Sequence, residues 1–281
     1  MKFLLTAINA KFIHSNPAIY SLRACVGEKL EPHVELAEFT INESLESILE
    51  GIWKRQPKVI GFSCYIWNWK LIREILTELP KILPDTEIWL GGPEVTYDGP
   101  RLLKEFPQVT GIMVGEGEVT FREVLGQYVR EAESTGQSEQ QPQPDSIEQQ
   151  AADRTGTVAG KNVAERFGQI SGLCLASGYT APRELTDLTT LPFLYEDMEP
   201  FTNRIIYYET SRGCPYRCSY CLSPIDKKVR LHDISVVKRE LQFFLDQNVK
   251  QVKFIDRTFN CDHKHAMEIW RYIYEHDNGV T

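Results

Sequence analysis

The chain has 281 residues, of which 42% are hydrophobic and 25% charged, with 31 basic and 39 acidic residues for a net charge of −8. These values are ordinary for globular proteins and exclude wholesale disorder, collagen-like repeats and coiled-coil composition. The apolar runs are far shorter than the roughly 20 residues of a membrane span, and the N-terminus lacks the long apolar region of a signal peptide. We therefore expect a cytoplasmic protein that needs no membrane. Its net acidity also argues against a nucleic-acid partner.

Residues 1–130 alternate short apolar runs with amphipathic segments. Apolar runs bounded by turn residues predict strands, and helical periodicity with capping residues predicts helices. The predicted strands are 3–8, 34–39, 58–63, 87–90 and 111–114, and the predicted helices are 17–30, 44–55, 69–79, 100–106 and 120–130. This pattern predicts a Rossmann-like (flavodoxin-like) α/β fold, a doubly wound parallel sheet of strand order 2-1-3-4-5 with helices on both faces.

The composition changes after this first domain. Residues 131–165 are rich in Gln, Ser, Pro and acidic residues with little to bury, which predicts a disordered linker or insertion. Residues 166–203 predict a hairpin over 168–179 and then an extended connector. Residues 204–281 hold a second βα series, with strands at 204–210 and 252–255 and helices at 234–248 and 262–276.

A cysteine-rich loop follows the strand at 204–210. Its sequence from residue 211 is SRGCPYRCSYCLS, which gives the spacing C-x3-C-x2-C for Cys214, Cys218 and Cys221. Cysteine thiolates are the usual ligands of iron–sulfur clusters and of structural zinc, and three of them on one loop can turn toward one point. Both kinds of site normally take four ligands, so three cysteines leave one coordination position open. A zinc site completed by Cys261 or His232 is the alternative.

Glycine-containing turns follow two strands of the first domain. The turn after 87–90 reads GGPE and the turn after 111–114 reads GEGE. Glycines at the carboxyl ends of strands allow a flat or bulky ligand to approach the backbone closely. The candidate ligand-binding residues at these ends, together with the last residue of the strand at 58–63, are Ser63, Gly91, Gly92, Glu94, Gly115 and Glu116. The alternative is that they form only tight βα turns.

The cysteine loop resembles the signature of the radical S-adenosylmethionine (SAM) superfamily. The resemblance rests on the cysteine spacing, on Tyr220 before the last cysteine and on Gly-Cys-Pro at the start of the loop. It implies a [4Fe-4S] cluster on the three cysteines, with SAM bound to the iron that lacks a cysteine and Tyr220 against the adenine. One-electron reduction, by a donor such as flavodoxin or ferredoxin, would cleave SAM to a 5′-deoxyadenosyl radical. The cofactors carry this chemistry and the protein positions them.

The strand at 252–255 leads into two polar residues, Asp256 and Thr258. Carboxyl ends of strands hold functional groups in α/β barrels, and the resemblance places this end beside the methionine part of SAM. The superfamily's usual Gly-Gly-Glu pattern is not visible on this strand. The alternative is that Asp256 pairs with Arg257 or caps the next helix.

Taken in order, the first domain, its GGPE and GEGE turns and the cysteine loop resemble the cobalamin (B12)-binding-domain-containing radical SAM proteins. The motif D-x-H-x-x-G, which supplies a histidine to cobalt, is absent, and His14 lies in the corresponding loop at the wrong spacing. We therefore expect no histidine ligand to cobalt, and we expect His14 to be a hydrogen-bonding residue of the loop. Residues 204–281 hold only the start of the superfamily's partial (β/α) barrel, so the chain resembles a truncated member that is inactive alone.

These features predict a radical SAM enzyme that transfers a methyl group from methylcobalamin to an unactivated carbon of a small molecule. One alternative is a radical SAM enzyme whose first domain binds no cobalamin, as in methylthiotransferases. Another is a non-catalytic protein that binds an iron–sulfur cluster or zinc. The sequence does not predict the substrate.

Overall fold

The computed structural model describes residues 1–136, 158–219, 221 and 228–276. The chain divides into two compact units. Unit 1 contains Met1–Lys11 and Ala18–Thr186, and unit 2 contains Phe12–Pro17 and Asp187–Thr281. Each unit has its own strands and its own buried side chains.

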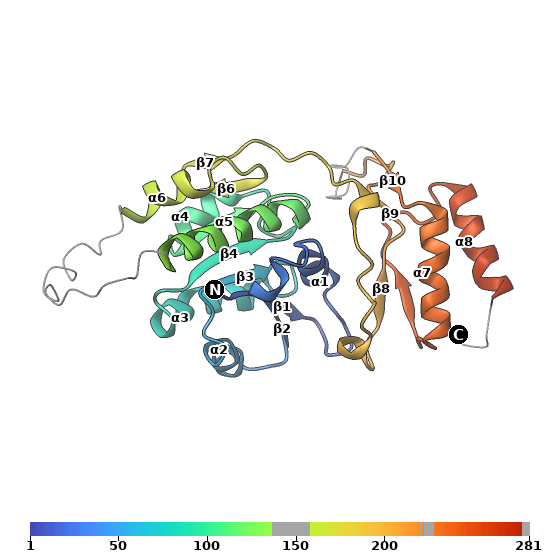
Figure 1. Ribbon diagram of the computed structural model, residues 1–281, viewed down its shortest axis with the longest axis horizontal. Coiled ribbons are helices and arrows are strands. Elements are labelled where there is room, and N and C mark those ends of the chain that lie inside the picture. Colours follow the sequence, from blue (N-terminus) through green and yellow to red (C-terminus); the bar gives the residue numbers. More distant parts are fainter. Residues whose placement is uncertain (137–157, 220, 222–227, 277–281) are drawn as a thin grey trace, which may run out of the picture. The chain divides into compact units, whose positions relative to one another are not determined.

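Unit 1 is built on a seven-stranded sheet of order β2-β1-β3-β4-β5-β6-β7 (Figure 1). The first five strands are parallel, and the last two add antiparallel to β5. The strands are β1 Phe3–Asn9, β2 Val34–Thr40, β3 Val59–Ser63, β4 Glu87–Gly91, β5 Val109–Met113, β6 Leu173–Leu175 and β7 Gly178–Tyr179. The predicted strand order 2-1-3-4-5 and the doubly wound fold are confirmed.

Helices cover both faces of this sheet because its strands are apolar on both sides. Along β1, Phe3 and Leu5 belong to a core packed against α1 and α5, whereas Leu4 and Ile8 belong to a core packed against α2, α3 and α4. This alternation follows from the period of two in a strand. The helices of unit 1 are α1 Pro17–Ala24, α2 Leu45–Trp53, α3 Trp69–Ile82, α4 Gly99–Glu105, α5 Glu118–Gly136 and α6 Val158–Phe167, with a short 3-10 helix at Glu31–His33.

Two predicted helix ends in unit 1 were wrong. The helix predicted to reach residue 30 ends at Ala24, and Gly27 then takes a positive φ of 80°, which turns the chain out of the helical direction. The helix predicted to end before Pro80 continues to Ile82. Proline has no N–H to bond the carbonyl four residues earlier. The Leu76 carbonyl accepts instead from the side-chain amide of Gln108 at 2.8 Å, which satisfies that group.

The segment predicted as a linker, 131–165, has helical ends. Residues 131–136 continue α5, and α6 begins at Val158. The reason is long-range packing, since Phe167 at the end of α6 is fully buried in the core on the α5 face. The hairpin predicted over 168–179 forms β6 and β7, which complete the sheet of unit 1. Residues 137–157 lie outside the described part of the chain.

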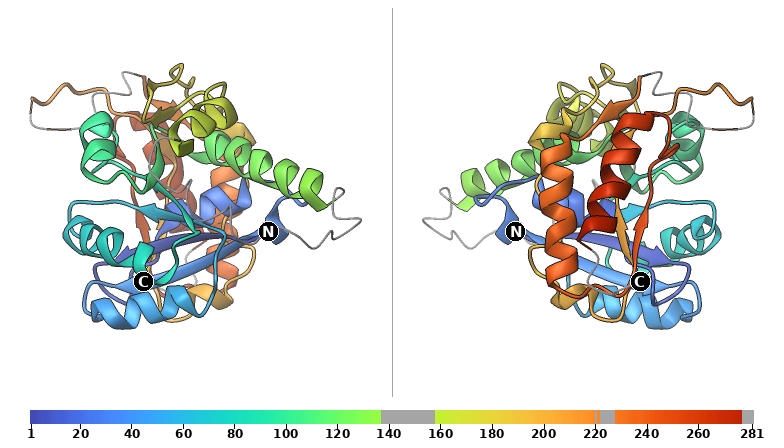
Figure 2. Two further views of the ribbon diagram at one scale, coloured as in Figure 1. Left: turned by 90° about the vertical axis from the view of Figure 1, so that its left-hand side faces the viewer. Right: turned by 90° about the vertical axis from the view of Figure 1, so that its right-hand side faces the viewer.

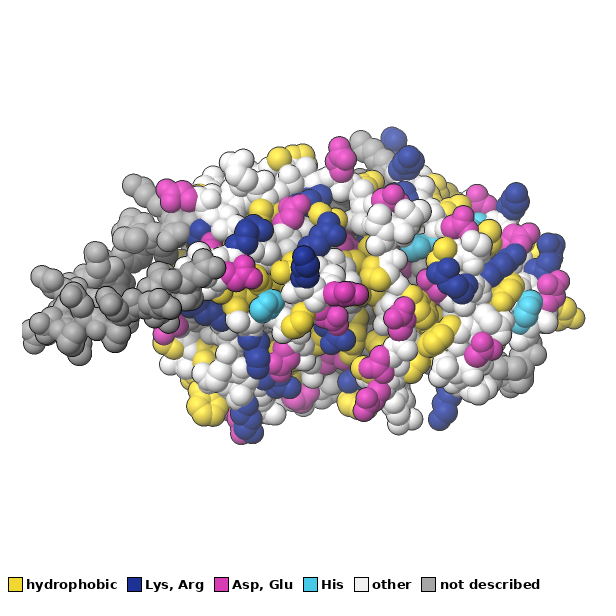
Figure 3. Space-filling model, in the orientation of Figure 1, with side chains coloured by type: hydrophobic (Ala, Val, Ile, Leu, Met, Phe, Trp, Pro, Cys, Tyr) yellow, Lys and Arg dark blue, Asp and Glu magenta, His cyan; other side chains and the backbone are white. Residues whose placement is uncertain are grey.

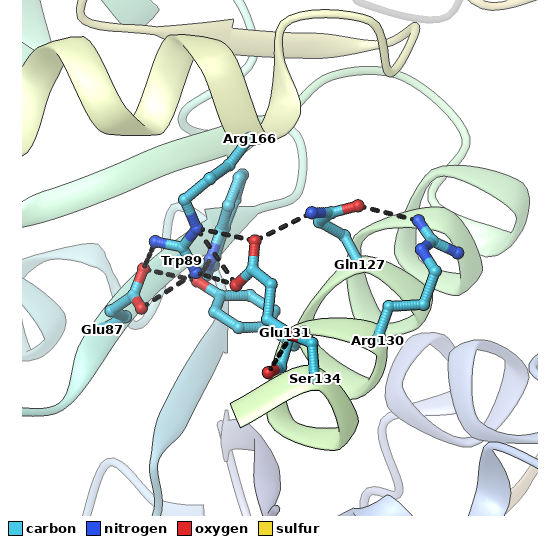
Figure 4. A network of polar contacts seen from close by, with 8 residues as sticks. Glu87, Trp89, Gln127, Arg130, Glu131, Ser134 and Arg166 are labelled. Atoms are coloured by element: carbon cyan, nitrogen blue, oxygen red, sulfur yellow. Dashed lines mark hydrogen bonds and ion pairs between the residues drawn. The ribbon is translucent and has the colours of Figure 1, made fainter. Parts of the chain in front are cut away.

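Arg166 of α6 is the centre of a polar network at the start of β4 (Figure 4). Its guanidinium pairs with the carboxylates of Glu87 and Glu131, each at 2.9 Å. The Tyr128 hydroxyl donates to Glu87 at 2.7 Å and accepts from the Trp89 indole at 2.9 Å. Burial acts to raise the pKa of Glu131, but hydrogen bonds from Arg166 and a neighbouring glutamine outweigh it and hold that pKa below its usual range.

Replacing Arg166 with methionine should destabilise unit 1 by about 2–4 kcal/mol, because two partly buried carboxylates lose their cation. Urea unfolding followed by tryptophan fluorescence measures this, since four of the five tryptophans lie in unit 1. The control is Arg101→Met, which breaks exposed pairs with Asp98 and Glu105 and should cost less than about 1 kcal/mol. The pKa of Glu131 is lowered in the folded state, so the contribution of Arg166 should be present at neutral pH and disappear as Glu131 protonates in acid. Equal losses for both variants would contradict a structural role for the Arg166 network.

Unit 2 contains two small sheets and two longer helices. Strands β8 Ile206–Tyr208 and β11 Val252–Phe254 pair in parallel, and β9 Ser211–Arg212 pairs antiparallel with β10 Arg230–Leu231. Helices α7 Ile234–Asp246 and α8 His263–Glu275 lie side by side (Figure 2). Asp233 and Asp262 cap them by accepting from backbone N–H groups. The parallel β8–α7–β11 arrangement confirms the predicted second βα series.

The connector before β8 contains 3-10 helices at Leu188–Thr190 and Glu199–Phe201. It packs through aromatic rings, with Tyr195 edge-on to Phe201 and in contact with Phe244 of α7. The connector therefore belongs structurally to the βα series that follows it.

Acidic and basic side chains are interspersed on the face of the molecule that Figure 3 shows. Within the described part of the chain, none of the helices has both the length and the apolarity needed to span a bilayer.

Candidate functional site

The cysteine loop is closed at its base by the short β9–β10 ladder. Ser211 lies opposite Leu231 and Arg212 opposite Arg230. Gly213 then has φ of 95°, and a Cβ there would lie 2.4 Å from the Lys228 carbonyl oxygen. Only glycine fits this position, because the two ends of the loop pass too closely for any side chain. The ladder and this glycine fix the two ends of the loop.

The three cysteines differ in exposure. Cys214 is half-buried beside the ladder, whereas Cys218 and Cys221 are exposed. The Cys221 N–H donates to the Cys218 carbonyl at 3.1 Å, which brings their backbones into one turn. Among the described residues, no three His, Cys, Asp or Glu side chains are grouped so that they could hold a metal ion. Convergence of the three sulfur atoms on one point therefore stays a prediction, and Tyr220 lies outside the described residues.

The residues after β11 lie against the entrance to the cysteine loop. The Asp256 carboxylate accepts from the Thr210 hydroxyl at 2.7 Å, from the Thr210 N–H at 3.2 Å and from the Ser211 hydroxyl at 2.5 Å. Asp262, and not Asp256, caps the next helix. Asp256 thus ties the end of β11 to the residues that lead into the loop.

Thr258 reaches the first cysteine of the loop directly. Its hydroxyl oxygen lies 3.3 Å from the Cys214 sulfur, within hydrogen-bonding distance for sulfur. The structure therefore brings Cys214, Asp256 and Thr258 together, although they are far apart in the sequence. Contact of Asp256 and Thr258 with SAM itself stays a prediction.

The Arg212 side chain near this entrance is already paired. Arg212 donates through Nε to Glu209 at 2.7 Å. Burial lowers the pKa of His232, and the positive charge of Arg212 lowers it further. The backbone N–H of His232 donates to the Thr210 carbonyl at 2.9 Å. His232 therefore also holds the loop entrance in place.

In unit 1, the predicted ligand-binding residues lie at the carboxyl ends of three neighbouring strands. Ser63 ends β3, Gly91 ends β4, and the GEGE turn follows β5. Gly92 has φ of 107°, and a Cβ there would lie 2.5 Å from the Cys64 carbonyl oxygen. Gly92 is therefore required by the close approach of two turns, which agrees with the alternative of tight βα turns at this position. The Glu94 N–H donates to the same carbonyl at 3.4 Å.

Gly115 differs from Gly92 because the space beside it is open. It has φ of 81°, and a Cβ there would meet no atom within 4 Å. The neighbouring Glu116 carboxylate accepts from the Thr186 N–H at 2.6 Å, so it fixes a chain segment instead of facing a ligand. Gly115 is thus the position in the glycine turns where a ligand has most room to approach.

The loop between β3 and α3 was not among the predicted site residues. Asn68 is fully buried there, and its amide donates to the carbonyls of Ile8 and Ser63 at 3.0 and 2.9 Å. The rings of Tyr65 and Trp67 stack at 4.4 Å, and Trp67 remains 47% exposed. The signal available in the sequence was the aromatic-rich run YIWNW soon after a predicted strand. Several large aromatic side chains at the end of a strand indicate a surface for a flat ligand.

His14 belongs to unit 2 and is engaged there. Its Nδ1 forms a hydrogen bond with the Tyr207 hydroxyl, and its backbone forms a parallel bridge with Ile205. His14 therefore forms a hydrogen bond, as predicted, and its partner is a residue of β8.

A doubly wound sheet with glycine turns at its carboxyl edge, followed by a βα series with a C-x3-C-x2-C loop, is the arrangement expected from the resemblance to cobalamin-binding-domain-containing radical SAM proteins. Residues 4–125 match the model of the B12 binding domain family. The chain is 25% identical over 229 residues to an uncharacterized methyltransferase of Pyrococcus horikoshii, PH0819, covering 80% of this chain and 45% of that protein. It is 26% identical over 214 residues to the cobalamin-dependent radical SAM methyltransferase TokK of Streptomyces tokunonensis, covering 73% of this chain and 28% of TokK.

Comparison with solved structures agrees on the fold. The structure of the cobalamin-dependent SAM radical enzyme OxsB, with aqua-cobalamin and SAM bound, superposes with a TM-score of 0.68 at 16% identity. The match covers 99% of this chain and 38% of OxsB. The chain thus spans less than half the length of these relatives. The resemblance to cobalamin-dependent radical SAM proteins is confirmed.

Proposed function

We propose that this chain is part of a radical SAM enzyme that binds a [4Fe-4S] cluster, SAM and cobalamin, and that transfers a methyl group to an unactivated carbon. The observation that carries the proposal is the three-cysteine loop, closed by the β9–β10 ladder directly after β8, in a chain whose first unit matches the B12 binding domain family. Either feature alone fits several functions, and the two together fit this one best.

The donor set of the loop fits an iron–sulfur cluster. Cys214, Cys218 and Cys221 would each supply one thiolate, and the fourth iron would remain for SAM. When bound and reduced, the cluster would give one electron to the sulfonium of SAM, whose C5′–S bond breaks to leave methionine and a 5′-deoxyadenosyl radical. The protein's own part is to hold the loop entrance, which Asp256 and His232 do through hydrogen bonds to Thr210. A flavodoxin- or ferredoxin-type protein would deliver the electron.

The carboxyl edge of the unit 1 sheet fits a large flat ligand. Ligands of doubly wound sheets bind outside the carboxyl ends of the strands. This edge carries the open space at Gly115 and the exposed ring of Trp67, which stacks on Tyr65. The aromatic rings would pack against apolar parts of cobalamin, and the glycine would admit it close to the backbone.

Cobalamin should bind the purified chain at about one per chain after gel filtration, without histidine coordination to cobalt. The electron paramagnetic resonance (EPR) spectrum of the reduced Co(II) form tests the second point when the protein is labelled with ¹⁵N. A histidine nitrogen of the labelled protein would split each cobalt line into two, whereas the unlabelled base of cobalamin itself would split it into three. Two-line splitting in the labelled protein would contradict the expected absence of a histidine ligand.

A matched pair of glycine variants locates the site. Gly115→Asn should weaken cobalamin binding at least about 10-fold, because asparagine tolerates positive φ but fills the open space. Gly27→Asn is the control, since Gly27 has φ of 80° with nothing within 4 Å of its Cβ position but lies after α1. Equal affinity of the two variants for cobalamin would show that Gly115 does not line the binding site. If the parent chain does not bind cobalamin, the cobalamin part of the proposed function is wrong.

A further inference from the structure

The half-buried cysteine of the loop has a specific polar neighbour. The Thr258 hydroxyl oxygen lies 3.3 Å from the Cys214 sulfur. Thr258 is itself half-buried, whereas Cys218 and Cys221 are exposed. Of the three candidate cluster ligands, Cys214 is therefore the one on which a hydrogen bond is best shielded from competing water.

Both partners of this contact are held by the backbone. On the cysteine side, Gly213 lies against Lys228, and the β9–β10 ladder ends one residue earlier. On the threonine side, the Thr258 carbonyl accepts from the Cys261 N–H at 3.1 Å. The Asp256 carboxylate joins the two sides through the Ser211 hydroxyl at 2.5 Å. The contact is thus part of a fixed arrangement.

We propose that Thr258 is a positioning residue whose hydroxyl donates a hydrogen bond to the Cys214 sulfur and raises the reduction potential of the cluster. The inference rests on the proposed function, because it assumes that Cys214 is a cluster ligand. A ligating thiolate carries no proton, so the threonine hydroxyl must be the donor. Donors to a charged acceptor form stronger hydrogen bonds than donors to a neutral one.

The direction of the effect follows from charge. Reduction adds an electron that the cluster shares with its thiolate ligands, so a hydrogen bond to the sulfur stabilises the reduced state more than the oxidised state. Hydrogen bonds to sulfur are among the determinants of iron–sulfur potentials. Loss of the Thr258 hydroxyl should therefore shift the midpoint potential to a more negative value and make the cluster harder to reduce.

The test is an anaerobic redox titration of the reconstituted chain, followed by the EPR signal of the reduced cluster, for the parent and three variants of Thr258. Thr258→Val removes the hydroxyl and keeps the shape, and Thr258→Ala removes both the hydroxyl and the methyl group. Thr258→Ser keeps the hydroxyl. The control is Thr202→Val, which removes an exposed hydroxyl that donates to the Glu199 carbonyl.

We expect the Val and Ala variants to share a negative shift and the Ser and Thr202→Val variants to match the parent. If the Val variant binds no cluster, the difference in midpoint potential between the Ser and Ala variants tests the inference by itself. Identical potentials in all variants, or a Ser variant that behaves like Ala, would overturn the inference while leaving the proposed function intact. Absence of an iron–sulfur cluster in the parent is the separate outcome that overturns both.

Discussion

Alanine in place of Cys214, Cys218 or Cys221 reduces the iron of the anaerobically reconstituted chain from about four atoms to less than one per chain. Each substitution removes one of the three protein ligands, and the two that remain hold the cluster too weakly to survive desalting. Iron and sulfide analysis, together with the absorption spectrum of the cluster, measures the effect. The three variants should lose the cluster equally, since no ligand is redundant.

Cys261→Ala provides the matched control for these variants. Cys261 is half-buried in the turn after β11, close in sequence to Thr258, and it is the cysteine that a four-ligand site would recruit. A three-cysteine cluster leaves Cys261 without metal, so Cys261→Ala should retain the full iron content. Loss of metal in Cys261→Ala as well would indicate a site with four protein ligands, as in structural zinc.

Gly92→Ala destabilises unit 1 by about 4–5 kcal/mol, which is at the upper end for point substitutions. The added Cβ would lie 2.5 Å from the Cys64 carbonyl oxygen and 3.1 Å from the Cys64 nitrogen. Both are backbone atoms of the β3 end, which cannot rotate away as a side chain can. The β3 and β4 turns would have to separate, and the hydrogen bond from the Cys64 N–H to the Gly91 carbonyl at 2.7 Å would be lost.

Gly178→Ala separates this clash from the cost of positive φ. Gly178 has φ of 119°, close to the 107° of Gly92, but a Cβ there would meet nothing within 4 Å. Its substitution should cost only the backbone strain, about 1–3 kcal/mol. Urea unfolding of the two variants, followed by tryptophan fluorescence, gives the difference. Similar losses in both would show that strain alone, and not the approach of the two turns, requires glycine at position 92.

The sheet of unit 1 could be predicted because its inner parallel strands are short, largely apolar runs. Burial on both faces leaves this pattern, and the right-handed crossover rule then leaves a doubly wound fold, for which 2-1-3-4-5 was the preferred strand order. Strand β10 was missed because it consists of only Arg230 and Leu231 and pairs across a long loop. The extension of α3 past Pro80 is supported by the hydrogen bond from Gln108, which lies 28 residues further along the chain than Pro80. A pattern of neighbouring residues therefore cannot predict it.

The candidate site was predicted in part for the same reason. The cysteine spacing is local and was visible, whereas the contacts of Asp256 with Thr210 and of Thr258 with Cys214 join two strands of a parallel pair. Sequence patterns placed these polar residues at a strand end but did not indicate what they touch. Likewise, the two glycine turns of unit 1 look alike in sequence, and only the structure shows that Gly92 is packed and Gly115 is open.

The EPR spectrum of the reduced, reconstituted chain, recorded with and without SAM, tests the central claim most directly. If three cysteines hold a cubane cluster and leave one iron open, SAM should coordinate that iron and change the spectrum of a cluster with about four irons per chain. The triple alanine variant of the loop should give no signal. A cluster spectrum that does not change when SAM is added would contradict the claim. So would a chain that binds one zinc ion and no iron.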